Sequence, residues 1–276
     1  MAPQSIVRND WVKEFIVELI GTMILCAFGN ASIAVWVLDP NKGSPLAIHF
    51  SWGIGATFGI YVSRGTSGGH INPAVTISKY ITTSFPLGKV FRYIAAQTAG
   101  AFLSSCLVYF TYMDMEKNDH TATIFATYPR DNVTVIQALG TSIIGTFLMI
   151  TSICAINDPT NHFKPDSGLA PIFTGMAVFV YGITFSLNTG YAINPARDFG
   201  PRLFIYMAGF SNVFTRGNNI ILYYWWIPLL GPIVGAVLAT IFYGVIFSEN
   251  LTIFGCHLKK TKNDNLNKED VTKMIT

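Results

Sequence analysis

Charged residues are scarce in this chain. Aspartate, glutamate, lysine and arginine make up 12% of its 276 residues, whereas soluble domains carry about 25%. Hydrophobic residues account for 51% of the sequence, and the mean hydropathy is +0.42. A soluble protein of this length could not cover its surface with so few charges, because charged side chains are the ones kept outside. The composition therefore predicts an integral membrane protein.

Clusters of catalytic or metal-binding residues are also missing. The four cysteines, Cys26, Cys106, Cys154 and Cys256, have no CxxC spacing, which favours free thiols packed as small hydrophobic groups. No nucleophile–base pair is visible, so the sequence predicts neither an enzyme nor a bound metal or cofactor. The net charge of +3 comes mostly from the C-terminal tail. Without a basic stripe, no nucleic-acid partner is predicted.

Long apolar stretches are what the sequence has in abundance. A membrane-spanning helix needs roughly 20 apolar residues, and six stretches are long enough. Two shorter stretches, at 72–83 and 194–207, would as helices cover only about half of a membrane. They are predicted to re-enter the membrane without crossing it. The six predicted spans run near 14–37, 46–63, 89–110, 135–156, 169–187 and 224–247.

One short phrase occurs twice, at the start of each shorter stretch. Residues 67–76 read Ser-Gly-Gly-His-Ile-Asn-Pro-Ala-Val-Thr, and residues 189–198 read Thr-Gly-Tyr-Ala-Ile-Asn-Pro-Ala-Arg-Asp. Asparagine is a preferred N-cap residue, and proline is favoured in the first helical turn, where its missing N–H is not needed. Asn72-Pro73-Ala74 and Asn194-Pro195-Ala196 therefore predict two helix N-termini.

The two halves of the chain are related by a repeat. Two segments of the first half are echoed in the second: Glu18-Leu-Ile-Gly-Thr22 by Ser142-Ile-Ile-Gly-Thr146, and Gln97-Thr-Ala-Gly100-Ala101 by Pro232-Ile-Val-Gly235-Ala236. Because each half holds three spans, an odd number, the second half is predicted to be inverted relative to the first. The predicted fold is an all-α polytopic membrane protein with six transmembrane helices, two re-entrant half-helices and an inverted three-helix repeat.

The channel domain is predicted to cover 14–250, with repeats at about 14–110 and 135–250. An N-terminal segment, 1–13, precedes it. The tail that follows, 251–276, is polar and lysine-rich and is expected to be disordered from Phe254 onward.

Lysine and arginine gather on the side of the predicted bundle where both ends of the chain lie. This bias predicts that the N- and C-terminal segments are both cytoplasmic. The sequon at Asn132 would then lie on the outer side of the membrane, where it could be glycosylated.

The backbone before each Asn-Pro-Ala triplet cannot lie against lipid, because its N–H and C=O groups would be unpaired there. It is predicted to line a polar path with ladders of carbonyl acceptors. The two half-helices would meet N-terminus to N-terminus, where their dipoles repel cations and the asparagine amides donate to a neutral solute. The predicted carbonyl ladders are Gly68, Gly69 and His70 in the first loop and Thr189, Gly190 and Ala192 in the second.

Four residues are predicted to converge on one level of this path as a selectivity filter: Trp52, Gly182, Tyr191 and Arg197. Arg197 lies three residues beyond Asn194 on the same helix face, and an arginine within a membrane is a functional residue by default. Its guanidinium could bind hydroxyl groups. Trp52 and Tyr191 could contact a carbon backbone, and Gly182 would leave room for it.

Five other polar residues each have two interpretations. Asp198 and Arg202, four apart on one helix, favour a structural ion pair over a direct solute contact. For Glu18, the favoured interpretation is a hydrogen-bond acceptor that anchors a loop, and the alternative is a carboxylate that couples transport to protons. His70 is expected to contribute its carbonyl, with a gating imidazole as the alternative, and His49 is expected to be packed or snorkelling.

The duplicated triplets, the Ser-Gly-Gly-His approach and the inverted repeat resemble the aquaporin or major intrinsic protein family, between about 11 and 250. Asp198, Gly182 and Pro228-Leu229 are similar to the aquaglyceroporin (glycerol facilitator) branch, and Trp52 stands where the bacterial facilitator has its filter tryptophan. The resemblance implies a homotetramer with one pore per subunit. Ser142 departs from the family pattern, which often has a second buried glutamate there.

The function that follows from these features is a passive channel for glycerol and water, and for other small neutral polyols or urea, that excludes ions and protons. One alternative is a water-selective channel or one for urea, ammonia or metalloid hydroxides. Another is an ion-coupled carrier, although the paired intramembrane charges that it would need are lacking. The predicted location is the plasma membrane.

Overall fold

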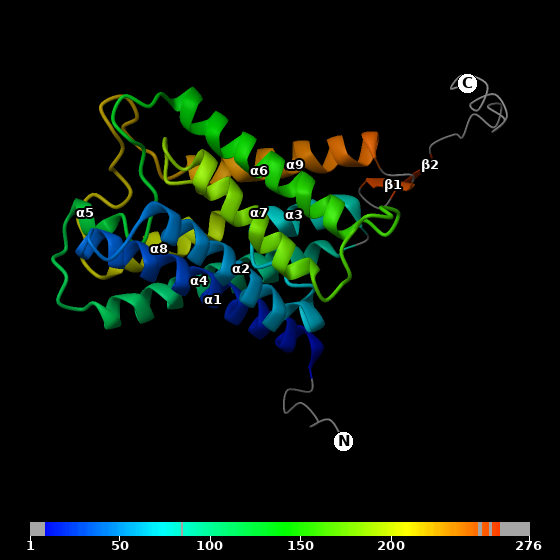
Figure 1. The fold of residues 1–276 in the computed structure, drawn as a ribbon, viewed down its shortest axis with the longest axis horizontal. Coiled ribbons are helices and arrows are strands. Elements are labelled where there is room, and N and C mark those ends of the chain that lie inside the picture. The colour runs from blue at the N-terminus through cyan, green and yellow to red at the C-terminus, as the bar shows by residue number, and fades with distance from the viewer. Residues whose placement is uncertain (1–8, 84, 248–249, 254–255, 260–276) are drawn as a thin grey trace.

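The structure is a computed structural model that describes residues 9–83, 85–247, 250–253 and 256–259. Six long helices, two half-helices and one short helix make up most of these residues (Figure 1). The elements are α1 (Asp10–Leu38), α2 (Pro45–Ser67), α3 (Pro73–Thr82), α4 (Leu87–Thr111), α5 (Asp119–Ala122), α6 (Val135–Asn157), α7 (Ala170–Phe185), α8 (Pro195–Met207), α9 (Ile227–Ile246), β1 (Asn250–Ile253) and β2 (Cys256–Lys259).

The helix boundaries follow local capping chemistry. Ser44 accepts a hydrogen bond from the backbone N–H of Ala47 at the start of α2, and Thr134 and Gln137 form a capping box at the start of α6. Helix α2 ends where Gly68 adopts a left-handed φ of 94°, a conformation that favours glycine. Each cap can be recognised from the local sequence.

The predicted architecture of six spans and two half-helices is confirmed. Helices α1, α2, α4, α6 and α9 are long and apolar enough to cross a membrane. Helix α7 is also apolar but has 16 residues, a length of about 24 Å at 1.5 Å per residue. The half-helices α3 and α8 have 10 and 13 residues, so neither can span.

Two small elements were not expected from the sequence. Helix α5 lies in the long connection before α6, where Asn118 and Thr121 form a capping box. Strands β1 and β2 pair as an antiparallel hairpin after α9. The expectation of disorder from Phe254 onward is therefore wrong for β2, while residues 1–8 and 260–276 of the predicted terminal segments lie outside the described residues.

The inverted repeat appears in the packing of the long helices. Helix α1 packs on α4, and α6 packs on α9. Both contacts use a glycine at the equivalent place, because a side chain on Gly100 would collide with the carbonyl of Leu19, and one on Gly235 with the carbonyl of Ile143. Such small residues allow helices to cross closely in lipid.

The two halves are joined through α2 and α7 and through the half-helices. Helix α3 of the first half packs on α9 of the second, and α8 packs on α4. The start of α1 and the end of α9 lie at one end of the bundle, which we call the termini side, and α5 lies at the other, which we call the loop side (Figure 1). Helix α3 lies toward the termini side and α8 toward the loop side (Figure 1), and the caps Asn72 and Asn194 each bond to the other loop. The half-helices therefore approach the centre from opposite sides with their N-termini together.

Candidate solute pathway

The two Asn-Pro-Ala triplets brace each other at the centre of the bundle. Each asparagine caps its own half-helix: Asn72 Oδ1 accepts from the Ala74 N–H at 2.9 Å, and Asn194 Oδ1 accepts from the Ala196 N–H at 3.0 Å. Each amide also reaches across the repeat, because Asn72 Nδ2 donates to the carbonyl of Ile193 at 3.1 Å and Asn194 Nδ2 to that of Ile71 at 2.9 Å. An amide NH2 has two protons, so each asparagine keeps one donor for a solute.

The loops before the triplets share an unusual backbone feature, two consecutive residues with positive φ. We call residues 67–72 the first loop and residues 189–194 the second loop. Gly68 and Gly69 have φ values of 94° and 68°, and their repeat equivalents Gly190 and Tyr191 have 68° and 59°. Ile71 has a φ of 45°, which is strained for a β-branched residue and persists only where its surroundings hold it.

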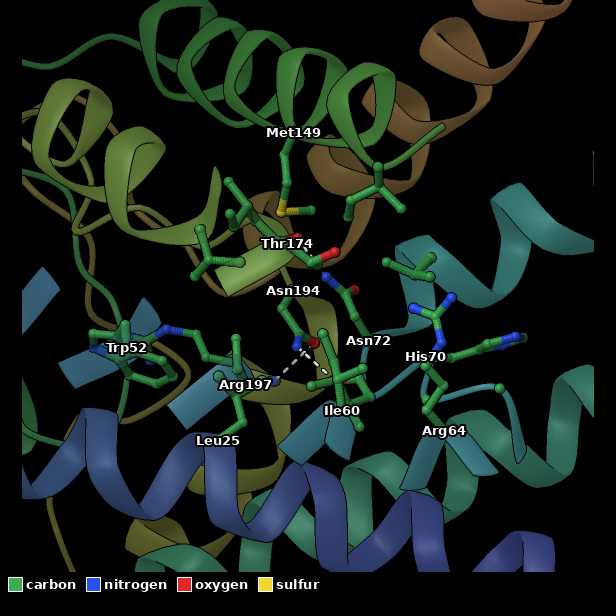
Figure 2. A pocket seen from close by; sticks show the side chains of 18 of the residues that line it. Leu25, Trp52, Ile60, Arg64, His70, Asn72, Met149, Thr174, Asn194 and Arg197 are labelled. Carbon is green, nitrogen blue, oxygen red and sulfur yellow. Dashed lines mark hydrogen bonds between the residues drawn. The ribbon is translucent and has the colours of Figure 1, made fainter. Parts of the chain in front are cut away.

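A cavity runs past both triplets, with Trp52 and Arg197 at one end and Arg64 and His70 at the other (Figure 2). Its polar lining comes from the first loop and from the amides of Asn72 and Asn194. Its apolar lining includes Leu25, Ala56, Ile60, Val75, Met149, Ile153 and Val178. The cavity therefore offers both hydrogen-bonding groups and apolar side chains to a solute.

The charged side chains that line this cavity are all cationic among the described residues: Arg64, Lys79 and Arg197. Arg64 is held by its bond to Asn157 Oδ1 at 3.0 Å. Together with the two half-helix N-termini, which carry partial positive charge, these side chains make the whole path unfavourable for cations.

Three of the four predicted filter residues meet at the loop-side end. The Arg197 guanidinium lies over the Trp52 ring at 4.5 Å and donates to the carbonyl of Phe125 at 3.2 Å. Tyr191 completes the wall, and its hydroxyl donates to the carbonyl of Val178 at 2.8 Å. The three side chains are 3–4% exposed, and all three line this end of the cavity.

Gly182, the fourth predicted filter residue, is not among the residues that line the cavity. It lies behind Tyr191, and a Cβ at this position would be 2.7 Å from His49 Nδ1 and 3.0 Å from Tyr191 Cζ. The room that the glycine was expected to leave for a solute is occupied by these two side chains.

The first loop is held by Glu18, which is fully buried. Its Oε1 accepts from Ser67 Oγ at 2.6 Å and from the His70 N–H at 2.9 Å. Its Oε2 accepts from the Ile71 N–H and from Gln97 Nε2, both at 2.8 Å. The predicted loop-anchoring role thus matches the geometry.

Asp198 and Arg202 form the predicted ion pair, at 2.8 Å with both side chains fully buried. Asp198 Oδ2 also accepts from the N–H and hydroxyl of Thr127, at 2.8 and 2.5 Å. Arg202 in turn donates to the carbonyls of Thr127 and Val213. Neither Asp198 nor Arg202 lines the cavity, so the pair ties α8 to loop-side segments and makes no contact with a solute there.

The predicted carbonyl ladders are only half reproduced. Gly68, Gly69 and His70 line the cavity, and the His70 ring is turned away onto Phe85 and Tyr93 with its Nδ1 3.2 Å from Thr76 Oγ1. In the second loop Tyr191 and Ile193 line the cavity instead of the predicted residues Thr189, Gly190 and Ala192. The Thr189 carbonyl is approached by the Tyr224 hydroxyl at 3.5 Å, and Thr189 is fully buried.

Three residues near the site were missed or left undecided by the sequence. Thr127 bonds Asp198 of α8, and Tyr224 bonds Thr189 of the second loop, over separations of 71 and 35 residues. No local sequence pattern predicts contacts at such separations. His49 lies three residues before Trp52 on the same face of α2. That spacing placed it beside the filter, and the contact with Gly182 gives it a role.

Asn132, the predicted glycosylation site, is exposed in the connection between α5 and α6. It has a φ of 65°, which asparagine tolerates better than most residues. Its glycosylation stays a prediction.

Comparison with known proteins agrees with this geometry. A model of the major intrinsic protein family matches residues 5–243. Aquaglyceroporin-3 of Trypanosoma brucei brucei is 38% identical over 88% of this chain and 80% of its own length. The glycerol uptake facilitator protein of Escherichia coli (strain K12) is 36% identical over 91% of this chain and 92% of its own.

A solved structure is also similar. The X-ray structure of the aquaglyceroporin from Plasmodium falciparum superposes with a TM-score of 0.76 at 30% identity, and the match covers 84% of this chain and 95% of that one. The chain belongs to the major intrinsic protein family. Members of this family are integral membrane channels and not enzymes, and the helices described above fit that class.

Proposed function

We propose that the chain is a passive channel for glycerol and water that excludes ions and protons. The observation that carries this proposal is the mixed lining of the cavity, in which hydrogen-bonding groups stand among apolar side chains. A polyol carries both hydroxyl groups and carbon, so it can form hydrogen bonds and apolar contacts along the same path. At the filter, Arg197 would donate to the hydroxyls while Trp52 and Tyr191 contact the carbons.

Ion exclusion follows from the charges along the path. A cation entering from either side meets arginine or lysine before it reaches the two opposed half-helix N-termini. A proton would need a water wire of uniform orientation, and the central donors of Asn72 and Asn194 oppose one. An ion-coupled carrier would need intramembrane charges of opposite sign along the path.

The choice of glycerol is supported by the relatives named aquaglyceroporin and glycerol uptake facilitator. We further propose a homotetramer in a lipid bilayer, located in the plasma membrane. The termini side would be cytoplasmic, and the loop side, with Asn132, would face outward. These assignments rest on the family resemblance and on the distribution of lysine and arginine.

The test is light scattering from liposomes that contain the purified protein. Re-swelling under a glycerol gradient, faster than in protein-free liposomes, is expected together with fast shrinkage under a sucrose gradient. Arg197→Met should lower glycerol permeability roughly tenfold, the value of one hydrogen bond to a charged group. Arg216→Met is the matched control, because Arg216 pairs with Asp119 at the loop side and does not line the cavity.

Two results would overturn the proposal. Fast shrinkage in sucrose without glycerol entry would leave a water-selective channel. Saturable uptake driven by an ion gradient would indicate a carrier. Comparing urea and ammonia in the same vesicles tests the remaining alternatives.

A further inference from the structure

The space beside Gly182 is filled from a different helix. His49 comes from α2, and its Nδ1 lies where a side chain at Gly182 on α7 would begin. The imidazole is 7% exposed, and its Nδ1 has no hydrogen-bonding partner in the described part of the chain. The main effect of the His49 side chain at this place is therefore to fill the space next to Gly182.

The imidazole is held in one position by two contacts. Its Nε2 lies 3.1 Å from Ser186 Oγ, just after the end of α7. Its ring meets the Tyr191 ring edge-on, with centroids 5.5 Å apart and an interplanar angle of 81°, an arrangement that aromatic rings favour. His49 itself does not line the cavity, whereas Tyr191 does. The ring of Tyr191 thus stands between His49 and the solute.

We propose that His49 is a positioning residue that determines solute size: it occupies the volume left by Gly182 and holds the Tyr191 ring forward into the filter. The proposal rests on the proposed channel function. The Tyr191 hydroxyl is bonded to Val178 on α7, and the ring already lies against Gly182. Without the imidazole, the ring could tilt into the space that His49 leaves, and the filter would widen on that side. The permeability of longer polyols would then rise more than that of glycerol, because glycerol already fits the narrower filter.

A compensating pair of substitutions follows from the same geometry. Gly182→Ala alone places a methyl group 2.7 Å from His49 Nδ1 and 3.0 Å from Tyr191 Cζ, so at least one of these two rings must shift. His49→Ala removes that collision. In the double variant His49→Ala/Gly182→Ala, the new methyl group on α7 fills part of the space that the imidazole of α2 leaves behind Tyr191.

The experiment measures erythritol and glycerol permeability in liposomes for the wild-type chain, both single variants and the double variant. His49→Ala should raise the erythritol-to-glycerol ratio roughly tenfold, the lower end of what one carbon unit is worth in a fitted pocket. Gly182→Ala should lower glycerol permeability, and the double variant should bring the ratio back toward the wild-type value. Phe50→Ala is the matched control, because Phe50 is adjacent on α2 but 52% exposed, and it should leave the ratio unchanged.

An unchanged ratio in His49→Ala, or a double variant that simply adds the two single effects, would overturn the proposal. If His49→Ala is not monodisperse in detergent, His49→Asn replaces it, because the amide keeps a polar group in the buried space, is smaller than the imidazole and should shift the ratio in the same direction. If wild-type vesicles pass water but not glycerol, the proposed function fails separately. Glycerol entry into the His49→Ala vesicles alone would then still support the positioning role, and continued exclusion would overturn it.

Discussion

The first loop is bonded directly by a carboxylate on a long helix, Glu18, whereas the carboxylate Asp198 of the second half-helix reaches the second loop through Thr127 and Tyr224. Glu18 of α1 receives four hydrogen bonds, two of them from backbone N–H groups of the first loop. Its repeat equivalent, Ser142 of α6, is buried and its Oγ has no partner among the described residues. The partner position has changed as well, because Gln97, which donates to Glu18, corresponds to Pro232.

In the second half, Asp198 takes over part of the anchoring from a different direction. It binds Thr127 and Arg202, and Arg202 extends the contact to Val213. Thr127 and Val213 lie in the loop-side connections, and Arg202 lies on α8 itself. The second loop is therefore steadied through the segments that cover it, and less through the long helix beside it.

The difference in anchoring between the two loops parallels a difference in backbone strain. Ile71 of the first loop has a φ of 45°, while its equivalent Ile193 does not have a positive φ, and the Ile193 N–H contacts the Tyr191 carbonyl at 3.2 Å. Ile71 is buried in this strained conformation, and its backbone N–H donates to the Glu18 carboxylate. The inverted repeat thus keeps two consecutive left-handed residues in each loop, and in the first loop Glu18 accepts from the two backbone donors that follow them.

The largest effect is expected from Asp198→Ala. It leaves the fully buried Arg202 without its carboxylate, and breaking such a pair costs about 3–5 kcal/mol. We expect a large drop in melting temperature in detergent and loss of glycerol permeability. The control is the double variant Asp198→Leu/Arg202→Met, which removes both charges and should recover part of the stability. Equal losses in the single and double variants would argue against a dominant role for the ion pair.

Glu18→Gln should have the next largest effect. The new amide group keeps the shape of the side chain but turns one acceptor oxygen into a donor that faces other donors. Leaving a buried donor unsatisfied costs about 1–3 kcal/mol, and the Asn72 region should become less ordered. Thermal unfolding and glycerol flux measure the two effects. Glu14→Gln, one turn earlier, loses a partly exposed contact with Lys89 and should change both values much less; a comparable loss would contradict the anchoring role.

Ser142→Glu tests whether the second half can accept the anchor of the first. The carboxylate could accept from Thr189 Oγ1, which is buried and has no partner among the described residues. We expect a gain of about 1 kcal/mol from one added hydrogen bond, seen as a higher melting temperature. Ser142→Ala should change the stability by less than about 1 kcal/mol, because the buried hydroxyl makes no bond among the described residues that would be lost. A lower melting temperature for the glutamate than for the alanine variant would show that the second half has no room for this anchor.

The smallest effect is expected from Asp158→Asn, just after α6. Burial by itself raises the pKa of Asp158, but hydrogen bonds from Thr160 and from the Tyr243 hydroxyl outweigh it and hold the pKa below its usual range. A lowered pKa adds stability above the ordinary aspartate pKa, about 4, and this stability is lost as the pH falls below it. Asp158→Asn should therefore flatten the acid side of the melting-temperature profile slightly. Identical profiles would assign the acid sensitivity to other carboxylates.

Much of the fold could be predicted because its signals are local. The six spans follow from apolar length, and the two half-helices from Asn-Pro at their first turns. The Asp198–Arg202 pair could be predicted because i and i+4 positions face each other on a helix. Helix α5 and the β1–β2 hairpin were not predicted, because each is short and short elements carry little periodic signal.

Within the site, the sequence predicted residue types better than it predicted contacts. Trp52, Tyr191 and Arg197 do meet around the cavity, but the space next to Gly182 was assigned to the solute and holds His49. That outcome depends on how closely α2 approaches α7. No spacing within either helix determines this distance.

The sequence by itself determined the membrane class, the inverted repeat, the two capped half-helices and the family. All of these depend on apolar length, on turn and capping chemistry, or on repeated segments, which act over a few residues at a time. Only the tertiary structure decided which atoms pair across the repeat. Asn72 reaches Ile193, Glu18 reaches the first loop, Thr127 reaches Asp198, and His49 fills the space at Gly182. These partners are distant in the chain, and close packing of the helices brings them within a few ångströms.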